Sequence, residues 1–156
     1  MDCHLALSLV AVARVAKSLD IAAIEFYSTY RPLKTPPRKC PKGKGRKKCL
    51  KRQREYHRIV KQQKSQHRFG RAIDIRWFKT ADDRTIDVLE HFDRRSKQPP
   101  CSYHPTAPEA TLLSKFVCRI YRQRLFNVML TPNANKAHHN HFHFDLTPGA
   151  RWNIIR

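Results

Sequence analysis

Two short segments of the sequence carry side chains that can bind a metal ion. The first places His67 in a loop and Asp74 seven positions later, within a run of alternating apolar and polar residues. The second reads His-His-Asn-His-Phe-His-Phe-Asp and ends at Asp145. Successive side chains of a strand point to opposite faces, so we expect His141, His143 and Asp145 to share one face. The intervening phenylalanines would then be buried on the other.

The residue types indicate hydrolytic metal chemistry. Two imidazoles and one carboxylate suit zinc, and three protein ligands leave one tetrahedral position open. Zinc lowers the pKa of water at such a position and polarises a carbonyl, which favours attack on an amide. A neighbouring histidine can move the proton from the water to the leaving amine, because its pKa lies near neutrality. The second segment offers both kinds of imidazole, one for the metal and one for the proton.

Patterns on either side of these segments predict the elements that position them. Apolar residues at helical spacing predict one helix over 4–18 and another from Pro108 through Tyr121. Alternating, β-branched or aromatic residues predict strands over 21–30, 71–78, 126–130 and 141–146. The segment 85–92 has no clear pattern. Because the elements do not alternate regularly, we expect an α+β fold with a small, mainly antiparallel sheet, flanking helices and the metal site on the sheet face.

The length of 156 residues fits a single domain, and within it a basic block stands out. Residues 34–64 hold 14 of the 32 Lys and Arg and one acid, Glu55. Residues 33–50, which are rich in proline and glycine, are expected to form an exposed loop, and Leu50 to Lys64 a short basic helix, so that 33–64 is a basic insert. The net charge of +20 favours an anionic partner: nucleic acid, acidic wall polymer or lipid headgroups. The block is either a surface that targets wall polymer or a solvated loop.

The cysteines bear on the compartment of the protein. The five residues show no C-x-x-C pair, and we expect two disulfides and one spare thiol from the set Cys3, Cys40, Cys49, Cys101 and Cys118. Such bonds favour an exported protein, in the periplasm or outside the cell, whereas free buried cysteines would fit a cytosolic domain. The sequence shows no signal peptide or membrane span, so an exported form is expected to have a leader that is not present in this chain.

The first segment reads Ser65-x-His67-x-x-Gly70-x-Ala72-x-Asp74, and the second contains His141-x-His143. This pattern resembles the zinc metallopeptidase superfamily of D-alanyl-D-alanine carboxypeptidases, penicillin-insensitive murein endopeptidases, lysostaphin-type enzymes and hedgehog signalling domains. The sequences of residues 67–75 and 135–145 are most similar to the bacterial extensin-like C-terminal domain family. The resemblance runs from the first helix to Leu146.

The resemblance implies a role for each matching residue. Zinc ligands would be His67, Asp74 and His143, the catalytic base His141, and a further active-site histidine His138. Arg31, at the exit of a strand, would bind a substrate carboxylate or the developing oxyanion. Ser65 and Asp145 would hold ligands in place.

The function implied is zinc-dependent hydrolysis of amide bonds in peptidoglycan peptides, of the D,D-carboxypeptidase or D,D-endopeptidase type. Because the dipeptidase branch has a glutamate where this chain has His141, the endopeptidase arrangement is the nearer one. The expected partner is peptidoglycan or another anionic wall polymer, and the expected state a monomer.

Two other classes of function compete with this one. Hedgehog domains keep the zinc site without peptidase function, so a non-catalytic, zinc-containing wall-binding module is one alternative. A nucleic-acid-binding protein or nuclease is the other alternative. The positive charge supports it, and the sequence His139-Asn140-His141 has the same letters as the HNH class of nucleases. Those letters name dispersed residues, however, and the basic block has only Tyr56 for base stacking. We therefore expect no nucleic-acid partner.

Overall fold

The computed structural model describes residues 1–32, 39–62, 65–94 and 100–156. The loop predicted over 33–50 is therefore described only in part. The last two residues of the predicted basic helix, Gln63 and Lys64, also lie outside the described residues.

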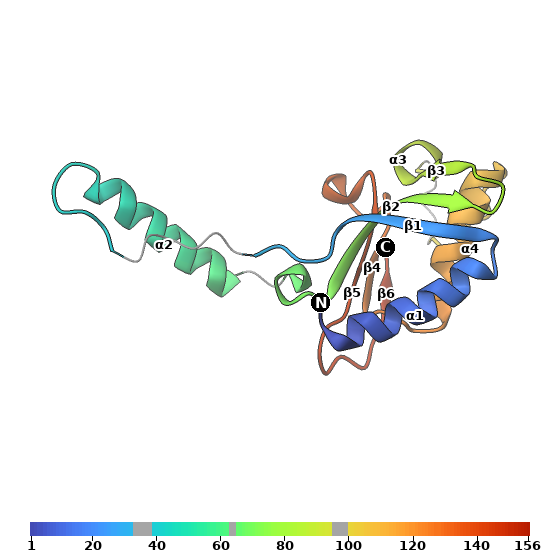
Figure 1. Cartoon of the computed structure of the whole chain (residues 1–156), viewed down its shortest axis with the longest axis horizontal. Helices are drawn as coiled ribbons and strands as arrows, with labels where there is room; N and C mark the ends of the chain where they lie inside the picture. The colour runs from blue at the N-terminus through green and yellow to red at the C-terminus, as the bar shows by residue number, and fades with distance from the viewer. Residues whose placement is uncertain (33–38, 63–64, 95–99) are drawn as a thin grey trace.

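In the described residues, one sheet collects six strands (Figure 1): β1 (Ile21–Ser28), β2 (Ala72–Thr80), β3 (Thr85–Asp87), β4 (Val128–Leu130), β5 (Phe142–Asp145) and β6 (Ile154–Ile155). The order is β1-β2-β5-β4-β6, with β3 beside β2. Every pairing is antiparallel except the parallel pairing of β4 with β6. This confirms the α+β class and a mostly antiparallel sheet, while β6 has no counterpart among the predicted strands.

Two long helices, α1 (Cys3–Lys17) and α4 (Pro108–Arg122), pack against each other and contribute to one core with the sheet (Figure 1). Both correspond to predicted helices, and Pro108 occupies the first turn of α4, where its missing N–H costs nothing. Phe142 and Phe144 of β5 are fully buried in this core. Because side chains alternate along a strand, the opposite face of β5 is left for His143.

The segment without a clear pattern in the sequence forms β3 and the short helix α3 (Val88–His91). Asp87 joins them, since its carboxylate accepts a hydrogen bond of 2.8 Å from the backbone N–H of Leu89. The same carboxylate binds Arg76 and the indole N–H of Trp77 in β2, at 2.9 and 3.1 Å. One side chain therefore fixes both the turn and its contact with the central strand.

The short helix η1 (Gln66–Phe69) leads into β2 and ends at Gly70. Gly70 has φ 64°, and a Cβ there would lie 3.1 Å from the Cα of Met1. Only glycine fits this combination of left-handed backbone and close approach. The start of α1 is held next to Gly70 by the following residue. Arg71 Nε donates a 2.8 Å hydrogen bond to the carboxylate of Asp2, and Asp2 caps α1.

The basic helix α2 (Arg46–Gln62) extends away from the sheet (Figure 1) and begins four residues before its predicted start. A disulfide between Cys40 and Cys49 ties the preceding loop to its first turn. At its other end, Arg68 of η1 donates a 3.5 Å hydrogen bond to the carbonyl of Val60. Among the helices of the described residues, none has the length and apolar character needed to cross a membrane.

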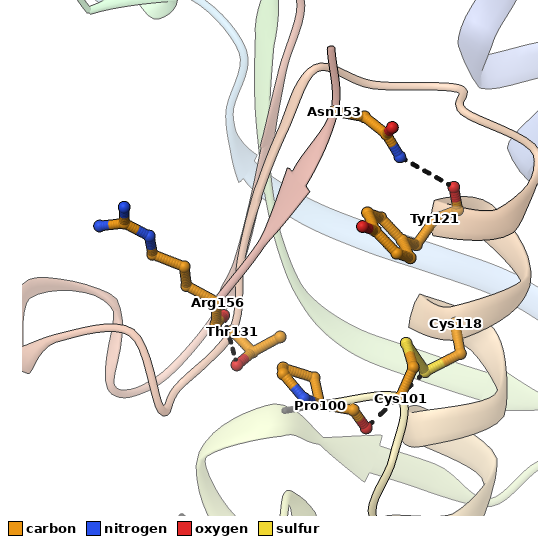
Figure 2. The surroundings of a disulfide bond; sticks show 7 residues. All are labelled: Pro100, Cys101, Cys118, Tyr121, Thr131, Asn153 and Arg156. Atoms are coloured by element: carbon orange, nitrogen blue, oxygen red, sulfur yellow. Dashed lines mark hydrogen bonds between the residues drawn. A yellow bond between two sulfur atoms is a disulfide. The ribbon is translucent and has the colours of Figure 1, made fainter. Parts of the chain in front are cut away.

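A second disulfide joins Cys101 to Cys118 of α4 (Figure 2). Cys3 is free and exposed, so the prediction of two disulfides and one spare thiol is confirmed. Near this disulfide, the C-terminal residues are held by two side chains: Thr131 Oγ1 donates to the carbonyl of Arg156 at 2.8 Å, and Asn153 Nδ2 to that of Tyr121 at 3.3 Å. The two disulfides indicate an oxidising environment.

Candidate metal centre

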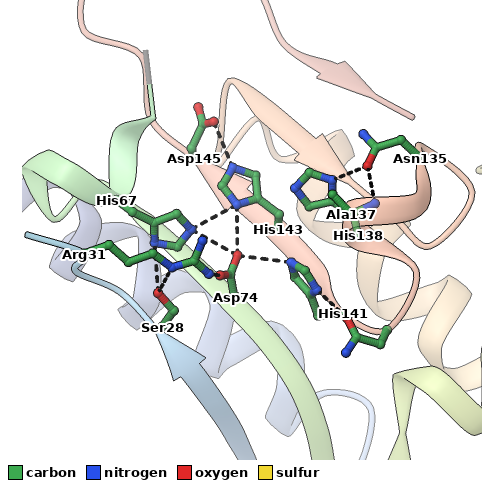
Figure 3. Close-up of polar contacts among 11 residues, drawn as sticks. Ser28, Arg31, His67, Asp74, Asn135, Ala137, His138, His141, His143 and Asp145 are labelled. Atoms are coloured by element: carbon green, nitrogen blue, oxygen red, sulfur yellow. Dashed lines mark hydrogen bonds and ion pairs between the residues drawn. The ribbon is translucent and has the colours of Figure 1, made fainter. Parts of the chain in front are cut away.

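Three potential ligands from three elements converge on one point (Figure 3): His67 of η1, Asp74 of β2 and His143 of β5. Asp74 and His143 are cross-strand partners in the antiparallel pairing of β2 with β5. Asp74 Oδ1 lies 3.0 Å from His67 Nε2 and 2.9 Å from His143 Nδ1, and the two imidazole nitrogens lie 3.1 Å apart. Segments separated by 69 residues thus form one triangle of donor atoms.

This triangle fits a divalent metal ion. Ligand bonds of about 2.1 Å in a tetrahedron place neighbouring donor atoms about 3.4 Å apart, so each pair here would open by only a few tenths of an ångström. Nitrogen and carboxylate oxygen are donors that zinc and similar ions accept. The His67, Asp74 and His143 group can therefore hold a metal.

Burial makes the negative charge of Asp74 costly, and Arg31 already contacts this carboxylate from the open side of the group. The exposed fractions of His67 and Asp74 are 2% and 1%. Burial raises the pKa of Asp74, but its interactions with the imidazoles of His141, His143 and His67 outweigh this effect and hold the pKa of the carboxyl well below its usual range. Asp74 is thus an anion inside the protein, where positive charge is needed to balance it.

A second group of potential ligands lies at the start of α1, but its character differs. It consists of Asp2, Cys3 and His4, of which Cys3 and His4 are exposed. Asp2 already binds Arg71 and caps α1. Of the two groups found in the described residues, only the one around Asp74 consists of three buried residues.

His143 is oriented from behind by an acid on its own strand. Its Nε2 lies 3.1 Å from Asp145 Oδ2, while its Nδ1 faces Asp74. Burial lowers the pKa of His143, but the hydrogen bonds to Asp145 and Asp74 outweigh it and raise this pKa to about 9. A carboxylate behind an imidazole fixes which nitrogen faces the metal, so Asp145 lies where a positioning group is needed.

A serine that the sequence patterns did not indicate lies behind His67. Ser28 Oγ, at the end of β1, is 3.4 Å from His67 Nδ1 and accepts a 2.9 Å hydrogen bond from Arg31 Nε. Ser65, the serine selected from the sequence, is exposed and makes no capping hydrogen bond with its side chain. The sheet register explains the difference, because Ser28 is the cross-strand partner of Asp74. No local pattern in the sequence shows that pairing.

Arg31 lies at the open side of the group. Its Nη2 contacts Asp74 Oδ2, and its backbone N–H donates to the carbonyl of His67 at 3.2 Å. The side chain of Arg31 is still 56% exposed. One edge of the guanidinium therefore meets the buried carboxylate while the rest faces solvent.

Two further histidines border the triangle (Figure 3). His141 Nε2 lies 3.4 Å from Asp74 Oδ1, and its Nδ1 lies 2.9 Å from the amide oxygen of Asn140. The rings of Tyr27 and His141 pack in a T-shaped arrangement, with centroids 5.2 Å apart. Because Asn140 accepts from Nδ1, the nitrogen of His141 that faces the metal group is left free to accept a proton.

His138 is the second of these histidines and lies beside both His141 and His143. The centroid of its ring is 5.1 Å from that of His141 and 5.3 Å from that of His143. Its Nδ1 is 2.8 Å from Asn135 Oδ1. Burial, together with repulsion from His143 and His141, lowers the pKa of His138 to about 4. His138 is therefore neutral near pH 7.

The structure thus brings together all but one of the side chains selected from the sequence: Arg31, His67, Asp74, His138, His141, His143 and Asp145. The exception is Ser65. Ser28 and Tyr27 are additional neighbours that come from β1.

Comparison with curated proteins and with solved structures finds no match to this chain. A comparison with protein families does find a match. The matched region contains every histidine and acid of the centre, whereas Ser28 and Arg31 lie before its first residue. The match covers residues 48–156 and has the description "Extensin-like protein C-terminus", which confirms the resemblance seen in the two segments; the chain belongs to this extensin-like C-terminal family.

Proposed function

We propose that this protein is a zinc-dependent amide hydrolase that acts on the peptides of peptidoglycan, as a D,D-endopeptidase or D,D-carboxypeptidase. One observation carries the proposal: a buried triangle of two imidazoles and a carboxylate has a third imidazole, that of His141, directly beside it. A purely structural zinc site has four protein ligands, whereas this group offers three and an adjacent proton acceptor.

Each residue has a defined task in this proposal. His67 Nε2, Asp74 Oδ1 and His143 Nδ1 would hold the zinc ion. Bound zinc would supply a Lewis acid that polarises the scissile carbonyl and lowers the pKa of a water molecule. His141 Nε2 would take the proton of the attacking water and pass it to the leaving amine, while Asn140 keeps its other nitrogen protonated.

Arg31 would meet the substrate. Two of its nitrogens are engaged, Nε with Ser28 and Nη2 with Asp74, and the exposed remainder of the guanidinium can bind a carboxylate or a developing oxyanion. A terminal D-alanine would provide such a carboxylate.

The remaining features are consistent with an exported enzyme of one domain. The two disulfides favour the periplasm or the outside of the cell as the place of action. We infer a single domain over 1–156, with 33–64 as a basic insert, because one sheet takes strands from both halves of the chain.

Digestion of purified peptidoglycan tests the proposal. Zinc-loaded protein should release new amino groups, on soluble muropeptides if it cleaves crosslinks or as free D-alanine if it acts as a carboxypeptidase. His141→Ala should abolish this release while zinc stays at about one ion per chain. His104→Ala, at an exposed histidine far along the sequence from the centre, is the matched control and should digest normally.

Two results would contradict the assignment. Digestion by the His141→Ala protein at the normal rate would show that this histidine is not the base. Stoichiometric zinc in the unaltered protein without any amide hydrolysis would favour a non-catalytic wall-binding module instead.

A further inference from the structure

The basic helix α2 is a surface that the metal centre does not use. It extends from the sheet (Figure 1), and its exposed cationic side chains point in several directions around the helix: Arg46, Lys47, Lys48, Lys51, Arg52, Arg54 and Arg58. Glu55 is the only acid in the helix. At about 1.5 Å per residue, 17 residues span about 25 Å.

The charges of α2 oppose its own stability. Its first turn contains no acid and begins Arg46-Lys47-Lys48, at the end of the helix where the macrodipole is already positive. Like charges four residues apart repel, as in Lys47 with Lys51 and Arg54 with Arg58. A helix with little tertiary packing is marginal in water even when its sequence favours helix. Bound anions would relieve both the repulsion and the unfavourable dipole.

The surface of α2 also limits what kind of anion it suits. Exposed large apolar side chains in the described residues occur in α1, in β1, at Met1, Tyr30, Phe69 and Trp152, and not among the described side chains of α2. Insertion into lipid needs such side chains. Base stacking needs exposed aromatic rings, but Tyr56 is half-buried and packs edge-on against His57 at 5.6 Å. What α2 offers is repeated positive charge alone.

The C-terminal end of α2 connects this charge to the metal centre, while the first turn is tied to the preceding loop. The Cys40–Cys49 disulfide anchors its first turn. At its C-terminal end, three residues separate Gln62 from η1, and Arg68 of η1 donates to the Val60 carbonyl. Since η1 also carries His67, an anionic chain bound along α2 would have one end close to the proposed site of cleavage.

We propose that α2 is a docking arm for peptidoglycan itself, which binds the free carboxylates of its stem peptides. This inference rests on the proposed function, since it takes the polymer that the centre would cleave as the occupant. Each exposed ion pair is weak, but several on one helix add up on a repeating polymer. The arm would raise the local concentration of crosslinked peptide without entering the chemistry.

Charge removal on one face of the arm tests this. The arm variant combines four glutamines on one face, spaced i, i+4, i+7 and i+11: Lys47→Gln, Lys51→Gln, Arg54→Gln and Arg58→Gln. Glutamine keeps helix propensity high. The body variant loses the same charge at exposed positions elsewhere: Arg14→Gln, Lys115→Gln, Arg122→Gln and Arg151→Gln. A third variant, Arg54→Lys with Arg58→Lys, keeps the charge.

Binding is measured first, without catalysis. Each variant is placed in the His141→Ala protein and sedimented with sacculi stripped of covalently attached accessory polymers. The arm variant should bind about tenfold or more weakly at 0.1 M salt, and the body and lysine variants within about twofold of the parent. Equal binding by the arm and body variants would overturn the docking proposal. So would loss of all binding when the accessory polymers are removed, or tighter arm-dependent binding to a short DNA duplex than to sacculi.

Catalysis is measured second, with His141 intact, and separates the two proposals. The arm variant should digest sacculi more slowly yet hydrolyse a small soluble muropeptide at the parent rate. If no variant hydrolyses either substrate but binding still depends on the arm, the hydrolase proposal fails and the docking arm stands. Equal loss on the soluble muropeptide would show that the arm variant damages the centre and would contradict a role in docking alone.

Discussion

Asp74 and His143 face each other across strands β2 and β5, with Asp74 Oδ1 2.9 Å from His143 Nδ1. The metal centre therefore depends on the register of this pairing. A slip of one residue would turn the side chains of β5 to the opposite face and offer Phe142 or Phe144 to the ion in place of His143. The burial of both phenylalanines in the core opposes such a slip, so the packing of one face of β5 fixes the position of His143 on the other.

Ser28 and Ser65 provide a direct comparison of the serine in the structure with the serine suggested by the sequence. Ser28→Ala removes the hydroxyl that lies beside His67 Nδ1 and accepts from Arg31. We expect zinc affinity to fall about tenfold, as is usual for loss of a group behind a ligand. Ser65→Ala should leave it unchanged, because that side chain is exposed. Competition with a chromogenic chelator measures both, and the reverse order would restore Ser65 as the positioning residue.

The stability of the metal-free protein should fall at high pH because of His143. Its pKa rises from 6.5 to about 9 on folding, so its protonated form stabilises the fold fully below pH 6.5, and this contribution is lost as the pH rises through 9. The difference corresponds to at most about 3 kcal/mol. Urea unfolding of metal-free protein between pH 6 and 9.5 should show the decline, and His143→Gln should flatten it. An identical decline in both proteins would assign it to other groups.

Zinc binding at pH 7 should release protons. His143 is protonated in the metal-free protein at this pH, and its Nδ1 must lose a proton to accept a metal ion. We therefore expect release of about one proton per zinc ion. Calorimetric titrations in two buffers with different ionisation enthalpies give the number. Asp145→Asn removes a hydrogen bond that raises the pKa of His143, so it should release well under one, and equal release by both would contradict this account.

The start of α1 should lose stability in acid. Hydrogen bonds from Arg71, and then from the backbone and ring of His4, lower the pKa of Asp2 from 3.8 to about 2. A lowered pKa contributes stability that is present above pH 3.8 and is lost as the pH falls through 2. Asp2→Ala should thus be less stable than the parent at pH 7, with the difference shrinking from pH 4 downward in thermal unfolding. Glu25→Ala, at an exposed acid of β1, is the control for the loss of charge alone.

Local patterns were enough to predict the elements that carry the centre. Alternation along 71–78 and 141–146 identified β2 and β5, because the period of two in a half-buried strand is visible in a few residues. The same alternation separated the histidines from the phenylalanines of β5. Alternation alone does not choose between His141 and His143, which share one face; the choice of His67, Asp74 and His143 as ligands came from the resemblance of the two segments to the metallopeptidase pattern.

What the sequence did not reveal depends on contacts between distant residues. The pairing of Ser28 with Asp74 is a matter of sheet register, which no pattern within β1 specifies. The two residues of β6 are too few to show any period, and their strand forms because β4 offers them a parallel partner. Helix α2 begins at Arg46 rather than at Leu50. Its added first turn contains Cys49, which the disulfide with Cys40 ties to the preceding loop.

The position of β1 at the edge of the sheet separates two tasks of the centre. This strand pairs with β2 alone, and its register shifts in three places, yet it supplies Tyr27 and Ser28 and leads to Arg31. Two of the three candidate ligands, Asp74 and His143, lie on the interior strands β2 and β5, whereas the residues that would meet substrate lie on or just after the edge strand β1. If the proposed hydrolase activity is correct, exchange of a few residues in or just after β1 would therefore change which bond is cleaved without moving Asp74 or His143.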